Sequence, residues 1–284
     1  MNNIHIITDS ASDIVGSHRK DLTVLPMTIT FGETEYLDGI NLSHIEFYEK
    51  LVECDALPTT SQIPPYNFTR AIQKITDAGD TAIVITLSSK LSGTYQSACV
   101  AAKEFEGKAF VVDSENVTVG ERALIEYALN LKDSGMDAIS IVEELDKTKK
   151  NIQLIALLDT LEYLKKGGRI SKTVAFAGNV LSIKPVVGVV NGEVAMLGKA
   201  RGSKHGNNLL AEHINKVGGI DFSKPYFLGY TGLSDALIQK YIQDSKALWS
   251  EIVGNLPVAT VGGTIGTHVG PGAIAVAFFS KSTL

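Results

Sequence analysis

The stretch TAIVITLSSKLSGTYQSACVAA (residues 81–102) changes from one hydrophobic pattern to another at its centre. Its first six residues form a short apolar run, as in a parallel strand that is covered on both faces. From Tyr95 onward, apolar and small residues recur at the spacing of one helix face. The hydroxyl-rich turn between them (88–93) stands where α/β proteins hold anionic groups at a helix N-terminus. The stretch therefore predicts a strand, an anion-binding loop and a helix of a parallel α/β sheet.

The same alternation of strands and helices extends over the first half of the chain. Apolar runs predict further strands at 4–8 and 109–114, and an extended stretch at 22–31 that Pro26 interrupts. Helical spacing of apolar residues predicts helices around 68–75, 124–131 and 138–145.

One helix has a sequence signal for its first residue. Ser43 and Glu46 have the spacing of a capping box, in which each side chain bonds the other residue's backbone amide. We expect the helix that follows to present Tyr48, Leu51 and Val52 on one face.

The second half changes character. Asn191-Gly192 between two apolar runs is a strong hairpin signal. The segment 257–279 again has two apolar runs around a glycine-rich turn, and we expect His268 in that turn. These patterns predict an α/β fold of two domains. Residues 1–150 would form a Rossmann-like α/β/α domain with a parallel sheet, and residues 151–284 a domain with a largely antiparallel sheet and packed helices.

Composition excludes several classes of protein. The chain has 284 residues, 44% of them hydrophobic and 20% charged, which is enough apolar material for a sizeable core. Its net charge of −5, without a basic run, argues against nucleic-acid binding. No stretch approaches the ~18 apolar residues of a membrane span, and the N-terminus lacks the pattern of a signal peptide. Cys54 and Cys99 are far apart, so we expect reduced thiols in a cytoplasmic protein.

Polar clusters follow several predicted strands, and parallel strands bring their carboxyl ends to one crevice. The clusters are TDSASD (8–13), TTSQ (59–62), SSKLSG (88–93) and DS (113–114). The sequence therefore predicts a binding crevice. A catalytic alternative uses Ser92 as nucleophile and His268 as base, although Ser92 is not in a G-x-S-x-G elbow. No phosphate-binding loop and no metal-ligand spacing of histidines is present.

These motifs together resemble the DegV family over nearly the whole chain. The resemblance rests on TDSASD (8–13), PTTSQ (58–62), SSKLSGTYQSA (88–98), VDS (112–114), LEYLKKGGRIS (161–171), KPV (184–186), KARG (199–202) and GTHVGPGA (266–273). Two departures are Ile63-Pro64-Pro65, where many members have Pro-Ser-Pro, and Thr118, where a serine is usual.

The resemblance implies a protein that holds a long-chain fatty acid in a tunnel between two domains. Such a protein is the non-catalytic acyl-binding partner of a bacterial fatty acid kinase, and the acyl phosphate formed feeds phospholipid synthesis. It implies no cofactor, and it allows a transient contact with a membrane surface for lipid exchange.

The same resemblance assigns residues to the site. Thr60, Ser92 and His268 would donate hydrogen bonds to the carboxylate, and backbone amides at Gly93 and Thr94 would add donors. Residues that support these or dock the kinase would be Ser61, Arg169 and Arg201. The Ser92/His268 hydrolase or acyltransferase stays open as an alternative. A third reading is a small polar pocket for a phosphosugar or a dihydroxyacetone-type ligand.

Overall fold

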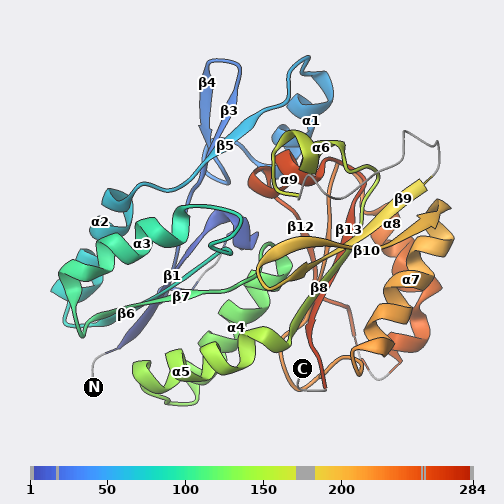
Figure 1. The fold of residues 1–284 in the computed structure, drawn as a ribbon. Helices are drawn as coiled ribbons and strands as arrows, with labels where there is room; N and C mark the ends of the chain where they lie inside the picture. Colours follow the sequence, from blue (N-terminus) through green and yellow to red (C-terminus); the bar gives the residue numbers. More distant parts are fainter. Residues whose placement is uncertain (1–2, 17–18, 171–182, 251, 253, 282–284) are drawn as a thin grey trace.

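The computed structural model describes residues 3–16, 19–170, 183–250, 252 and 254–281. These residues form three sheets with helices packed against them (Figure 1). None of the helices in the described ranges is long and apolar enough to cross a membrane.

The first sheet is parallel, as predicted, with strand order β2-β1-β6-β7. Its strands are β1 (Ile4–Asp9), β2 (Leu22–Leu25), β6 (Thr81–Thr86) and β7 (Ala109–Asp113). The helices beside it are α2 (Pro65–Asp77), α3 (Thr94–Ala102), α4 (Val119–Asp133) and α5 (Ala138–Thr148), with short 3-10 turns η1 (Ser10–Ser12), η2 (Lys103–Phe105) and η3 (Lys149–Asn151). Ile7 and Val84 face α2 and α3, whereas Ile6 and Ile83 face α4 and α5. Both faces are covered, which explains the continuous apolar runs.

The second sheet has the order β10-β9-β8-β13-β11-β12 and is antiparallel except for the pair β11 and β12. Its strands are β8 (Ile152–Leu157), β9 (Ile183–Val190), β10 (Glu193–Arg201), β11 (Phe227–Tyr230), β12 (Val258–Thr260) and β13 (Ile274–Phe279). The helices of this half are α6 (Glu162–Lys166), α7 (Gly202–Lys216), α8 (Ala236–Asp244) and α9 (Gly263–Val269), with the turn η4 (Lys246–Trp249). Helices α7 and α8 cover one face, and the other face lies toward the first half of the chain. The predicted fold class is confirmed.

The hairpin predicted at Asn191-Gly192 joins β9 to β10. Both residues have positive φ, 51° for Asn191 and 81° for Gly192, which is the geometry that a tight two-residue turn requires. The hydroxyl of Ser88 donates a 2.7 Å hydrogen bond to the carbonyl of Gly192. The turn is therefore fixed to the hydroxyl-rich loop of the first half.

A third, small sheet has the order β4-β3-β5 and was not foreseen from the sequence. Its strands are β3 (Thr28–Phe31), β4 (Thr34–Leu37) and β5 (Thr59–Ser61), and α1 (His44–Glu53) packs against it. The capping box of Ser43 and Glu46 is confirmed at the start of α1. Tyr48 and Leu51 are buried against the small sheet, whereas Val52 is 69% exposed and lies at the solvent-facing edge of that face.

The predicted second hairpin at 257–279 is also wrong. Strands β12 and β13 are not neighbours, because β11 lies between them, and the glycine-rich segment forms helix α9. Asp38 caps this helix by accepting bonds from the amides of Gly263 and Thr264. Gly263 and Gly266 have no side chains, and this lets α9 approach α1 closely: a Cβ on either would lie 2.5 Å from a carbon of Ile29 or Phe47.

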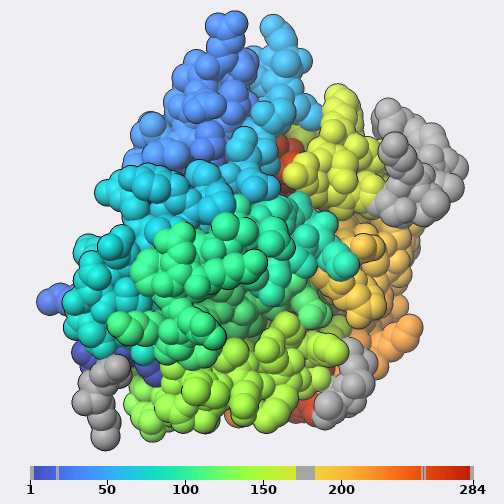
Figure 2. All heavy atoms as spheres, turned by 60° about the vertical axis from the view of Figure 1, so that its left-hand side comes forward, coloured from blue at the N-terminus to red at the C-terminus, as the bar shows by residue number. Residues whose placement is uncertain are grey.

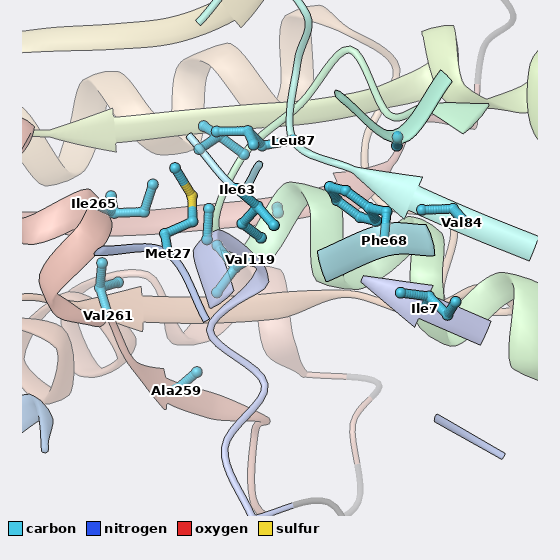
Figure 3. Packing of buried hydrophobic residues seen from close by; sticks show 14 of the residues in the cluster. Ile7, Met27, Ile63, Phe68, Val84, Leu87, Val119, Ala259, Val261 and Ile265 are labelled. Atoms are coloured by element: carbon cyan, nitrogen blue, oxygen red, sulfur yellow. The ribbon is translucent and has the colours of Figure 1, made fainter. Parts of the chain in front are cut away.

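The core between the parallel sheet and the six-stranded sheet mixes residues from both halves. Figure 3 shows Met27, Leu87 and Val119 of the first half in the same cluster as Val261 and Ile265 of the second. On the surface, the blue-to-green first half and the yellow-to-orange second half meet along a broad contact (Figure 2). The chain passes from the parallel sheet to the six-stranded sheet between β7 and β8, but α9 packs back on β3 and β5.

Candidate functional site

A cavity lined by both polar and apolar side chains, called the polar cavity below, lies where the small sheet, the hydroxyl-rich loop and α9 meet. Four residues predicted for the site are distant in sequence, yet all four line this one cavity: Thr60, Ser92, Arg169 and His268. Its other lining residues are Met27, Gln62, Leu87, Leu91, Val117, Leu164, Val194, Thr264, Ile265 and Val269. The folded chain thus brings together groups from β5, from the loop before α3, from the segment after α6 and from α9.

Thr60 and His268 are in direct contact. Thr60 Oγ1 lies 2.9 Å from His268 Nε2. Burial, and secondarily the positive charge of Arg169, lowers the pKa of His268 to about 4. The imidazole is therefore neutral at neutral pH and has one N–H to donate.

The surroundings of the ring decide which nitrogen has that proton. His268 Nδ1 is buried and has no hydrogen-bond partner among the described residues. A buried N–H without an acceptor is more costly than an unused ring lone pair, so the proton belongs on Nε2. Nε2–H then donates to Thr60 Oγ1, and the Thr60 hydroxyl keeps its own proton for a ligand in the cavity.

Ser92 is held in a similar way. The amide of Thr94 donates to Ser92 Oγ at 3.3 Å, and the two hydroxyl oxygens are 3.0 Å apart. Thr94 is fully buried and, like Gly93, is not among the residues that line the polar cavity. The structure therefore places Thr94 behind Ser92, where it orients the Ser92 hydroxyl at the start of α3.

The remaining predicted residues lie in different surroundings. Arg169 lines the polar cavity and donates to the carbonyls of Leu91 (3.2 Å) and Gly167 (2.6 Å). Ser61 is exposed, and Arg201 is exposed at the end of β10 and lines none of the cavities found in the described residues next to Thr60.

A second, apolar cavity adjoins the polar one over the six-stranded sheet. Both cavities are lined by Val117, Leu164, Val194, Ile265 and Val269, so the two spaces adjoin and share a wall. The residues that line only the apolar cavity are Thr118, Leu154, Ala156, Leu158, Val187, Gly188, Val189, Gly229, Tyr230, Thr231, Val261, Ala273, Ile274 and Ala275. The hydroxyl of Thr118, one of the departures from the family pattern, bonds Asp13 at 2.5 Å and does not add a free polar group.

In two of the predicted strand-end clusters, the aspartate accepts hydrogen bonds from backbone amides and lines neither the polar nor the apolar cavity. Asp9 accepts from the amides of Ala11 and Leu87, and burial raises its pKa to about 7. Asp113 accepts from the amides of Ser89 and Glu115. The apolar wall residues were missed, because their sequence pattern is that of any core.

The geometry does not assemble a catalytic triad. The hydroxyl that contacts His268 Nε2 belongs to Thr60, not to Ser92. In the described part of the chain, no carboxylate bonds His268 Nδ1 to orient the ring. In the same ranges, no cluster of His, Cys, Asp or Glu suited to a metal ion is found. The arrangement provides two oriented hydroxyls and a cation beside an apolar space.

The family model, the curated relatives and the solved structures that resemble this chain all belong to one family. A family model described as "Uncharacterised protein, DegV family" matches residues 3–281. A DegV domain-containing protein of Caldanaerobacter subterraneus is 33% identical over 99% of this chain and 100% of its own. A solved structure titled as fatty acid binding of a DegV family protein from Thermus thermophilus superimposes with a TM-score of 0.88 at 30% identity, covering 98% of this chain and 99% of the other. DegV of Bacillus subtilis, titled a fatty acid binding protein, gives 0.81 at 28% identity over 98% and 99%.

Proposed function

Because this chain belongs to the DegV family, we propose that it binds one long-chain fatty acid, with the carboxylate in the polar cavity and the acyl chain in the apolar cavity. The observation that carries the proposal is that two cavities adjoin, one lined in part by Thr60, Ser92 and His268 and the other almost wholly by hydrocarbon. A small polar ligand such as a phosphosugar would leave the apolar cavity unfilled.

Hydroxyl donors suit a carboxylate that must react later. A hydrogen bond to a charged acceptor is worth about 1.5–3 kcal/mol, so Thr60 and Ser92 together position the head group firmly. Arg169 lies in the same cavity, and its bonds to Leu91 and Gly167 hold it at the wall. Its charge offsets part of the cost of burying an anion.

The acyl chain supplies most of the affinity. Each buried methylene contributes ~0.8 kcal/mol, so a chain of about sixteen carbons offers on the order of 12 kcal/mol before association costs. Those costs remove several kcal/mol, and submicromolar binding remains. The apolar cavity therefore needs no ion pair at the head to retain its ligand.

We further propose that the bound carboxylate is presented to a separate fatty acid kinase, and that the acyl phosphate serves phospholipid synthesis. The chain itself would be non-catalytic, which fits the lack of a Ser92–His268 contact. We place it in the cytoplasm, where its free thiols Cys54 and Cys99 would stay reduced. Residues 1–150 and 151–284 would act as the two domains that enclose the ligand.

The test is the lipid content of the purified protein. Native mass spectrometry should show a fatty acid in one-to-one ratio, and delipidated protein should bind labelled palmitate. Absence of lipid together with no binding of added palmitate would refute the proposal. Turnover of a p-nitrophenyl ester by the purified chain, lost in Ser92→Ala, would favour the hydrolase instead.

A further inference from the structure

Strand register gives the apolar cavity a defined floor. Ala156 on β8 lies directly opposite Val187 on β9 and, on its other side, opposite Ala275 on β13. Ala275 in turn lies opposite Gly229 on β11. Residues that are directly opposite in antiparallel strands point to the same face. These four residues therefore form one row across the sheet, and all four line the apolar cavity.

The side chains in this row become smaller with distance from the polar cavity. The polar cavity adjoins the β10 edge of the row, because Val194 on β10 lines both cavities. Gly229 lines only the apolar cavity, and its strand β11 lies four strands away from β10 in the sheet.

The far end of the row is closed. A Cβ on Gly229 would lie 3.2 Å from a methyl of Val119 and 3.2 Å from a methyl of Val261. Ile265 and Val269, one turn apart on α9, line the same cavity nearer the polar end. The row of four residues thus crosses the strands along the wall of the apolar cavity and ends at Gly229.

We propose that this transverse row, Val187–Ala156–Ala275–Gly229, is the gauge that sets acyl chain length, with the chain lying perpendicular to the strands. The inference rests on the proposed function. Neighbouring strands are about 4.8 Å apart. A zigzag of carbon–carbon bonds of about 1.5 Å advances about 1.3 Å per carbon. Each strand step therefore corresponds to about four carbons.

A larger side chain in the row should shorten the longest fatty acid that binds, and the loss should be greater the nearer the substitution lies to the polar cavity. Ala275→Leu fills the step before Gly229 and should lower the longest acid bound by about four carbons. Ala156→Leu fills one strand earlier and should lower it by about eight. Ala247→Leu, on the exposed turn η4, is the matched control and should leave the profile unchanged.

The measurement is competitive loading of delipidated protein with an equimolar series of saturated acids from octanoate to eicosanoate, followed by mass spectrometry of the bound acids. Retained binding of the short acids shows that each variant is folded. If a leucine variant does not fold, Ala156→Val and Ala275→Val should show the same order with smaller shifts. Equal shifts at both positions, a reversed order, or an unchanged profile would overturn the gauge. Failure of the wild-type protein to take up any acid would instead refute the proposed function.

Discussion

Asp38 Oδ2 accepts hydrogen bonds from both the amide and the hydroxyl of Thr264, at 3.1 and 2.5 Å, across 226 residues of sequence. Its second oxygen accepts from the amide of Gly263 at 3.2 Å. The first turn of α9 is therefore capped by a side chain from the other half of the chain. This contact holds the helix that carries His268.

Asp38→Ala should loosen α9 and lower affinity for fatty acid. The change removes the acceptors of two buried amides, and we expect the free energy of unfolding to fall by about 1–3 kcal/mol. Asp38→Asn keeps one oxygen acceptor and should lose less. Chemical denaturation and palmitate titration of both variants are the measurements. Wild-type values for Asp38→Ala in both assays would show that the cap does not hold α9.

The hydroxyls of Thr60 and Ser92 should matter chiefly for a charged head group. Thr60→Val and Ser92→Ala should each weaken palmitate binding by about 10- to 150-fold, the equivalent of 1.5–3 kcal/mol. Binding of the methyl ester, which has no charge, should change much less. Ser61→Ala, on the exposed side of β5, is the control. Equal losses for acid and ester would indicate a packing effect instead of carboxylate binding.

His268 should make stability depend on pH between about 6.5 and 4. The unfolded chain takes up a proton near pH 6.5, whereas burial delays uptake in the folded chain to a pKa of about 4. The contribution of His268 is thus fully present above pH 6.5 and is lost as pH falls toward 4, by about 3 kcal/mol.

The non-titrating variant His268→Gln isolates this effect, because the buried carboxyls titrate in both proteins. The unfolding free energy of wild type minus that of the variant should decline over this window. Parallel curves, or an NMR titration of the ring centred near pH 6.5, would contradict the assignment of a neutral buried imidazole.

Arg169 and Arg201 were predicted as a pair, but their surroundings predict different effects. Arg169 lines the polar cavity, so Arg169→Ala should weaken fatty acid binding as well as any phosphorylation by an added kinase. Arg201 is exposed on β10, so Arg201→Ala should leave lipid content and melting temperature unchanged and reduce phosphorylation only. Normal turnover in the double variant would exclude a role for either residue in docking.

Local patterns predicted much of the fold. Short apolar runs located β1, β6 and β7, and the turn chemistry of Asn191-Gly192 located the hairpin, because each depends on neighbours in sequence. Thr60, Ser92 and His268 were also named in advance, through the family resemblance, and the structure brings them to one cavity.

What could not be predicted depends on distant partners. Glycines in 262–272 suggested a turn, but Asp38 caps the segment as a helix, and α1 provides the surface that requires Gly263 and Gly266. The row of residues along the apolar cavity likewise depends on the register between strands β8, β13 and β11, which are far apart in sequence. No local pattern contains that register.

The long-range capping of α9 also has a consequence for biosynthesis. About 225 residues separate Asp38 from Gly263, and a ribosome adds about 5–20 residues each second. The nascent chain would therefore wait roughly 11–45 seconds with Phe47 and Tyr48 of α1 uncovered, until α9 emerges to cover them. We expect that chaperones bind this apolar surface during synthesis, and that lipid loading follows release from the ribosome.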